Sequence, residues 1–152
     1  MKFTAKQIAE WFLNYNAMQI EEFGDGTERL SNLKLQKLLY YAQGCYLALK
    51  DQPLFDDDFL AWTHGPVIQC IYDEYKKYGP NGIPKPEKYE NVLPKEVQDI
   101  LVEVYEVFGK YSAWGLRNMT HQEDPWKNTP NSGVISKESI KKYFKEHYIE
   151  NA

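Results

Sequence analysis

The chain has 152 residues, a length that fits one compact domain and is short for two. Hydrophobic residues make up 43% of it, so the composition excludes a wholly disordered protein. Lys and Arg number 18 against 22 Asp and Glu, and the net charge of −4 lacks the basic excess that duplex nucleic-acid binders usually carry. Aromatic residues reach 15%, and more than half of them are Tyr, which suits both cores and contact surfaces.

The two cysteines, Cys45 and Cys70, are too few for the disulfide framework of a small secreted domain, and we expect both as reduced thiols. The N-terminal residues contain no apolar segment of the kind found in secretory signal peptides. No apolar stretch approaches the roughly 20 residues that span a bilayer. The sequence therefore predicts a soluble, cytoplasmic protein with no membrane partner.

Two helices are predicted in the first third of the chain. Thr4 and Gln7 have the spacing of a capping box, and the apolar residues behind them recur with helical period. Ser31 is a second N-cap candidate, for a helix that continues to about Lys50. This second helix has apolar residues on more than one side, a pattern typical of a helix at the centre of its domain.

The middle of the chain combines a short apolar segment with turns. Residues 59–62 read Phe-Leu-Ala-Trp and are a candidate strand. Gly65 and Pro66 predict a turn into a third helix, with Pro66 as its first residue and His64 beside its backbone N–H groups. Residues 79–94 contain four prolines and two glycines, so we expect an extended connection there, which is a candidate for contacts with a partner.

The second half continues with helices that have identifiable starts. One helix is expected after Pro94, and Ser112 is the N-cap candidate of the next. Asp124 stands before a proline as an N-cap would, and Ser136 opens the last helix. We therefore predict a mainly α fold over residues 1–152, a single compact helical domain of about six helices with at most a minimal β element.

Motifs for metal binding and nucleophilic catalysis are missing from the sequence. Three histidines and two cysteines occur without the close pairing that structural zinc sites need, and we predict no metal and no cofactor. No Gly-x-Ser-x-Gly elbow occurs, and both cysteines fall in the middle of predicted helices, where a thiolate is not stabilised. A hydrolase using His64, His121 and Asp124 is an alternative if the three side chains converge. Against it, Asp124 is expected to cap the helix that follows.

Two dense clusters of polar and aromatic residues stand out, at residues 62–67 and 120–126. Each is either a corner that its tryptophan pins to the core or a polar site held by a rigid turn. Basic residues gather locally at Lys141, Lys142 and Lys145, but glutamates lie beside them, which favours a solvated helix face. We expect no nucleic-acid binding by this chain alone.

The run 33–44, Leu-Lys-Leu-Gln-Lys-Leu-Leu-Tyr-Tyr-Ala-Gln-Gly, resembles the signature of the Panacea domain, the family of SocA-type antitoxins and of phage-associated proteins. Further motifs follow in the family's order, and the resemblance covers about residues 30–130. The motif residues to which the resemblance assigns a structural role are Leu35, Gln36, Lys37, Leu38, Tyr40, Tyr41, Trp62, Gly65, Pro66, Thr120, Pro125 and Trp126.

The resemblance implies a mostly helical fold and an antitoxin without enzymatic activity, which binds and neutralises a cognate toxin encoded beside it. The alternative within the family is a protease adaptor, which delivers its toxin to protease machinery for degradation. Because Tyr and Trp are enriched at interface cores, we expect partner contacts from the tyrosines of the third helix and the loop after it. We also expect contacts from the polar corner that His64 and His121 would form. The candidate partner-binding residues are His64, Tyr72, Tyr75, Tyr78 and His121, although Tyr75 and Tyr78 also fit a core stripe.

Overall fold

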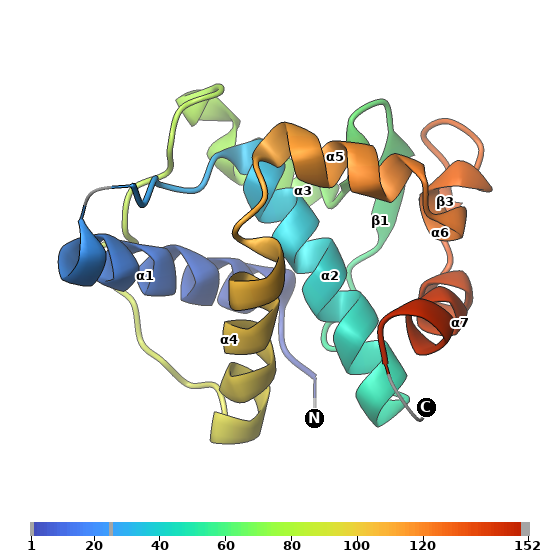
Figure 1. Cartoon of the computed structure of the whole chain (residues 1–152), viewed down its shortest axis with the longest axis horizontal. Helices are drawn as coiled ribbons and strands as arrows, with labels where there is room; N and C mark the ends of the chain where they lie inside the picture. Colours follow the sequence, from blue (N-terminus) through green and yellow to red (C-terminus); the bar gives the residue numbers. More distant parts are fainter. Residues whose placement is uncertain (1, 25, 150–152) are drawn as a thin grey trace.

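The computed structural model describes residues 2–24 and 26–149, and the fold is mainly α (Figure 1). The elements in chain order are α1 (Ala5–Phe23), α2 (Asn32–Lys50), β1 (Phe59–Trp62), β2 (Gly65–Val67), α3 (Gln69–Tyr75), the 3-10 helix η1 (Lys76–Tyr78), α4 (Lys95–Phe108), α5 (Ala113–His121), α6 (Asp124–Lys127), β3 (Val134–Ile135) and α7 (Lys137–His147). The predicted mainly α fold is confirmed, with seven α-helices in the described ranges where about six were expected. None of these helices combines the length and the apolarity needed to cross a membrane.

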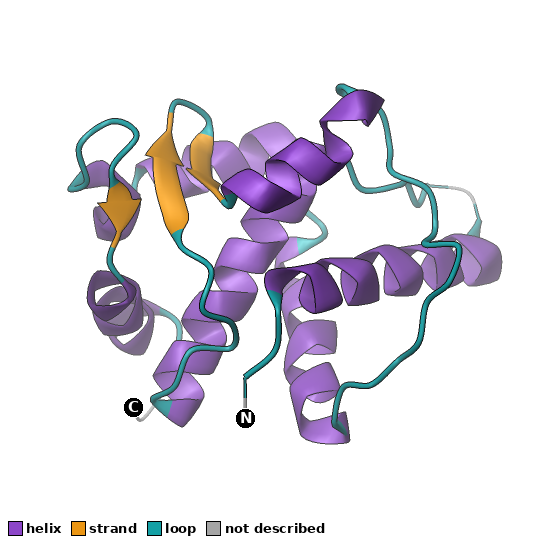
Figure 2. Ribbon diagram, turned by 180° about the vertical axis from the view of Figure 1, so that it is seen from behind, coloured by secondary structure: helices purple, strands orange, loops and turns teal. Residues whose placement is uncertain are grey.

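Helix α2 runs through the middle of the molecule, with α1 and α4 on one side and α7 on the other (Figure 1). The small sheet and α5 lie against its N-terminal half (Figure 2). The side chains of Leu35, Leu39, Tyr40 and Leu47 are all buried, although they point to different sides of the helix. A helix that is apolar all round needs neighbours all round, so the predicted central place of α2 is confirmed.

Four predicted helix starts are confirmed by their caps. The Thr4 hydroxyl accepts a hydrogen bond from the backbone N–H of Gln7 (3.1 Å), whose side chain accepts from the N–H of Thr4 (2.9 Å). The hydroxyls of Ser31, Ser112 and Ser136 each accept from the N–H three residues further on, at 3.2, 2.9 and 3.1 Å. Each such cap contributes about 1 kcal/mol, so the starts of α1, α2, α5 and α7 are set by local sequence.

The segment after residue 62 is a β-hairpin, and the predicted helix start at Pro66 is wrong. Strand β1 pairs antiparallel with β2 on one side and with β3 on the other, and Ala61 lies opposite Pro66. Gly65 has a φ of +111°, which turns the chain back along β1. Pro66 lies on an edge strand, where its missing N–H removes no ladder bond. Helix α3 begins only at Gln69, so His64 belongs to the hairpin turn.

The extended connection predicted for residues 79–94 is confirmed, since the structure assigns no helix or strand to this span. Two of its residues, Ile83 and Leu93, are buried in the core. The N–H of Ile83 also donates to the carbonyl of Leu30 (2.8 Å), which fixes the connection to the segment before α2. The core therefore holds this long connection near each of its ends.

Buried amide side chains hold the irregular segments to the helices. Gln43 of α2 accepts from the N–H of Leu54 (2.7 Å) and donates to the carbonyl of Phe55 (2.8 Å). Asn16 of α1 donates to the carbonyl of Glu28 (2.9 Å) and accepts from the N–H of Leu30 (3.1 Å). These bonds satisfy backbone groups that the helices and the sheet leave unpaired, and they fix the path of the chain on both sides of α2.

Candidate partner-binding site

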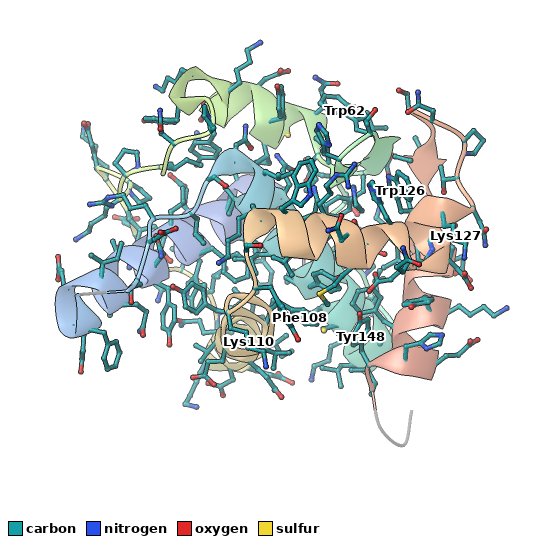
Figure 3. All side chains as sticks on the ribbon, turned by 45° about the horizontal axis from the view of Figure 1, so that its top comes forward. Trp62, Phe108, Lys110, Trp126, Lys127 and Tyr148 are labelled. Carbon is teal, nitrogen blue, oxygen red and sulfur yellow. The ribbon has the colours of Figure 1, made fainter. Side chains whose placement is uncertain are left out.

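Two regions far apart in the sequence meet at one corner of the molecule: the β1–β2 hairpin and the consecutive helices α5 and α6. The indole N–H of Trp126 donates to the backbone carbonyl of Trp62 (2.8 Å), which ties α6 to the hairpin (Figure 3). The Trp126 ring stacks on His121, with ring centroids 3.9 Å apart and an interplanar angle of 10°. The Trp62 ring packs edge-on against Tyr72 of α3, at 5.1 Å. The two tryptophans of the sequence clusters thus hold one common corner.

Lys37 lies beneath this corner and is fully buried. Its Nζ donates to the backbone carbonyl of Pro66 (3.2 Å), and burial together with the charge of Arg117 lowers the pKa of Lys37 to about 7. Gly65 leaves room for the amine: a Cβ there would lie 2.6 Å from Lys37 Cε and 2.8 Å from the Thr120 hydroxyl oxygen. The lysine, the glycine and the threonine of three separate motifs therefore fit together as one buried contact.

Gln36 and Asn32 hold the hairpin from α2. Gln36 accepts from the N–H of Ile68 (2.9 Å), just before α3, and donates to the side chain of Asn32 (3.2 Å). Asn32 in turn donates to the carbonyl of Tyr72 (3.1 Å). This chain of bonds fixes β2 and α3 on the central helix, so the side chains that the hairpin exposes have a rigid base.

The solvent-facing part of the corner consists of the exposed side chains of His64 and Trp114 and the half-buried Arg117, and we call these three residues the Arg117 cluster. The Nε of Arg117 donates to His64 Nδ1 (3.1 Å), and the guanidinium lies 4.2 Å from the centroid of the Trp114 ring. The Trp114 side chain is 53% exposed, and His64 is exposed as well. Trp114 and Arg117 are not among the partner-binding residues predicted from the sequence. Nothing in the local pattern of α5 indicates that these two side chains contact the distant hairpin turn.

A groove of about 590 Å³ opens beside the Arg117 cluster, and we call it the hairpin groove. The residues lining it include Leu33, Trp62, His64, Val67, Tyr72 and Lys76. His64 and Tyr72, two of the predicted partner-binding residues, therefore lie on one surface. That surface is partly aromatic and lies between the hairpin, α2 and α3.

The other predicted contact residues are less available. Tyr75 is only 9% exposed and packs in the core, so its prediction as an exposed contact is wrong. The core stripe, which the sequence also allowed for Tyr75, is the one that the structure has: Ile71 and Tyr75 share the buried face of α3, and Tyr72 lies outside it. Tyr78 and His121 are half-buried, Tyr78 against the core and His121 under Trp126.

The three residues of the hydrolase alternative do not share one pocket. His121 stacks on Trp126, its Nε2 is buried without a hydrogen-bond partner among the described residues, and burial and the Arg117 charge lower its pKa. Asp124 lines a different pocket, between α6 and α7, and no hydrogen bond joins it to His121 in the part of the chain described. Asp124 is also not the predicted cap, since the N-cap residue of α6 is Glu123 and makes no side-chain cap bond.

The cysteines have raised pKa values, which disfavours a thiolate in both. Burial raises the pKa of Cys45 to about 12. Cys70 lies in the first turn of α3, so its predicted place in the middle of a helix is wrong; burial and the neighbouring Asp57 raise its pKa. Over residues 2–24 and 26–149, no group of three or more His, Cys, Asp or Glu side chains is arranged to hold a metal ion.

A buried carboxylate, which the sequence gives no reason to single out, ties the C-terminal helix to the core. Glu123 Oε2 accepts from the hydroxyls of Tyr41 (3.0 Å) and Tyr148. The Tyr41 ring stacks on Phe108 at 4.0 Å, and Tyr148 approaches the same ring edge-on (Figure 3). Burial raises the pKa of Glu123 to about 7, and the two tyrosine hydrogen bonds oppose that shift.

The fold and this corner define a small helical domain whose separated sequence motifs converge on one corner that buried hydrogen bonds hold. The chain matches the family model described as Antitoxin SocA-like, Panacea domain, over residues 35–127. The chain therefore belongs to this family, which confirms the resemblance stated from the motifs. The matched range contains every family-motif residue named above, from Leu35 to Trp126.

Among curated proteins, the chain is similar to Antitoxin SocA of Caulobacter vibrioides (strain NA1000 / CB15N). The two are 35% identical over an alignment 109 residues long, which covers 64% of this chain and 58% of that relative. The match thus spans little more than half of the relative's length. No solved structure matches significantly.

Proposed function

We propose that this protein is a cytoplasmic antitoxin that neutralises a cognate toxin by direct complex formation, without enzymatic activity. Membership of the SocA-like Panacea family and the similarity to a protein named as an antitoxin support this function. In this proposal the toxin is a protein encoded beside the gene for this chain. The contact face is formed by the hairpin groove and the Arg117 cluster.

We choose this surface because aromatic and basic side chains are accessible there on a backbone that α2 holds in place. Tyr72 is 37% and Trp114 53% exposed, and both lie close to His64. Tyr, Trp and Arg contribute most of the binding energy at protein interfaces. Because buried bonds from α2 fix the backbone beneath them, binding costs little ordering of this face.

The first test is co-expression of this chain with the product of the adjacent open reading frame. We expect the neighbour to be toxic alone and harmless with this chain, and the two to co-purify. A neighbour that is harmless alone, or that forms no complex, contradicts the proposed function. The lifetime of the toxin in cells then separates two modes: a longer lifetime indicates sequestration, and a shorter one indicates delivery to a protease.

The contact face is tested by Tyr72→Ala. Removal of the ring is expected to weaken the complex at least about tenfold, measured by calorimetry, because an exposed aromatic anchor is lost. The melting temperature should stay close to that of the wild type. Tyr111→Ala is the matched control, since Tyr111 is 39% exposed and lies outside the groove. Equal weakening by both changes, or a large loss of stability from Tyr72→Ala alone, contradicts the assignment.

A further inference from the structure

The Arg117 cluster carries positive charge without a carboxylate to balance it. Every ion pair found between described residues uses a lysine, and none of the described carboxylates lies within 4.0 Å of the Arg117 guanidinium. The titratable side chains beside the cluster on α2, the hairpin and α5 are Lys37, His64 and His121, which are all basic. The two carboxylates at α6 have other surroundings: Glu123 accepts from Tyr41 and Tyr148, and Asp124 lines the pocket between α6 and α7. In a chain with 22 acidic residues, this corner is a local exception.

The neighbouring groups respond to this uncompensated charge. The charge of Arg117 lowers the pKa of Lys37 below the corner and of His121 beside it, in addition to the effect of burial. A nearby carboxylate would oppose both shifts. An anion that docked on Arg117 would therefore enter a region of positive potential that the protein itself leaves open.

The guanidinium is held in place for such a ligand. Its Nε donates to His64 Nδ1 (3.1 Å), its Nη1 donates to the side chain of Asn118 (2.9 Å), and its Cζ lies over the Trp114 ring, 4.2 Å from the ring centroid. Nη2 has no acceptor among the described residues. His64 accepts at Nδ1, so its neutral form carries the proton on Nε2, on an exposed side chain. Two N–H donors from different residues thus remain for one planar acceptor, and arginine is well suited to bind a carboxylate in this way.

We propose that the Arg117 cluster binds an aspartate or glutamate side chain of the toxin, with Trp114 covering the contact and His64 as a second donor. This inference rests on the proposed function, since it names the group that the contact face recognises. A protein carboxylate fits better than the backbone of a nucleic acid, because the chain has a net charge of −4 and a phosphate chain would meet repulsion beyond this corner. An exposed Trp in cation–π contact with an Arg also combines two residue types that are enriched at hot spots between proteins.

The test uses the full chain and the toxin from the adjacent reading frame, with growth and a measured Kd as readouts. Arg117→Glu is expected to weaken the complex at least about 30-fold and to abolish neutralisation. Arg117→Lys should restore only part of the affinity, because an ammonium keeps the charge and loses the stacked planar donor group. Arg29→Glu is the matched control, since Arg29 is an exposed arginine outside the corner and should bind as the wild type does. Changing Asp and Glu residues of the toxin to Lys, one at a time, should give at least one variant that rescues Arg117→Glu.

The outcomes separate this inference from the function on which it rests. If the wild-type chain neither neutralises nor binds the adjacent gene product, the proposed function fails. If the wild type binds and Arg117→Glu binds within about twofold of it, only the carboxylate contact is overturned. Loss of binding that no acidic-to-basic change in the toxin restores also overturns it. Should Arg117→Glu not fold, Arg117→Gln answers the same question, because its complex must lose affinity and become less sensitive to salt than the wild-type complex.

Discussion

At position 65, both the backbone conformation and the packing require a glycine. Its φ of +111° is one that residues with a side chain rarely adopt. Its missing side chain also leaves the space that the Lys37 stem and the Thr120 hydroxyl occupy. A glycine-proline pair reads as a turn from sequence alone, but the kind of turn depends on this contact with two distant residues. Local pattern therefore predicted the turn correctly and the element after it wrongly.

Gly65→Ala is expected to destabilise the protein by about 4 kcal/mol, from backbone strain and from the clash with Lys37 and Thr120. Urea denaturation of the purified chain measures the change. Gly79→Ala is the control, because Gly79 also has a positive φ (+58°) and no atom within 4 Å of its added Cβ. It should cost about 1–2 kcal/mol, the strain alone. Equal losses for the two variants would show that the Lys37 contact is not tight.

At the scale of elements, α2 supplies hydrogen bonds as well as apolar surface. Gln43 satisfies the backbone of residues 54–55, and Gln36 that of Ile68, so the helix positions two segments that form few backbone bonds of their own. The starts of the helices were predictable because a cap bonds within three residues of itself. The bonds of Gln36 and Gln43 reach 32 and up to 12 residues along the chain, and neither helical period nor composition indicates their partners.

Gln43→Leu tests this role of α2. The change leaves the N–H of Leu54 and the carbonyl of Phe55 buried without partners, and we expect a loss of about 2–4 kcal/mol in the free energy of unfolding. Gln69→Leu is the control, since Gln69 is exposed and makes only long contacts to Asp73. Its effect should stay within about 0.5 kcal/mol. A Gln43→Leu protein as stable as the control would mean that the loop at 54–55 is held by apolar packing alone.

In the candidate site, too, residues marked by a local sequence pattern were predictable, and residues brought in by long-range contacts were not. Tyr72 and His64 were identified because aromatic and polar residues gather near the predicted turn, and both line the hairpin groove. Trp114 and Arg117 were not, because their contacts with His64 join residues about 50 positions apart. Tyr75 fitted both a core stripe and a contact surface in the sequence, and its burial decides for the core. The family motifs singled out the segments around Lys37, Gly65 and Thr120. That these segments meet at one corner is seen only in the structure.

At the scale of the whole molecule, two buried groups, Glu123 and Lys37, give the stability an unusual dependence on pH. Glu123 has a pKa of about 7 against its ordinary 4.5, so between pH 4.5 and 7 the folded chain holds a proton that the unfolded chain has lost. Stability contributed by this group therefore falls as pH rises through that window. Lys37 has a pKa of about 7 against its ordinary 10.5, so between pH 7 and 10.5 the unfolded chain holds the extra proton. Stability contributed by Lys37 therefore rises with pH there.

The two windows meet near pH 7, where these two groups together favour the folded state least. Glu123→Gln should remove the decline between pH 4.5 and 7 and keep one side-chain oxygen that can accept from the hydroxyls of Tyr41 and Tyr148. Lys37→Met should remove the rise between pH 7 and 10.5 and keep the apolar stem that fills the space beside Gly65. Each difference between wild type and variant should have a slope of up to about 1.4 kcal/mol per pH step of one, confined to its own window. Urea denaturation at a series of pH values measures both, and a variant whose curve runs parallel to the wild-type curve would show that its buried group titrates as it does in water.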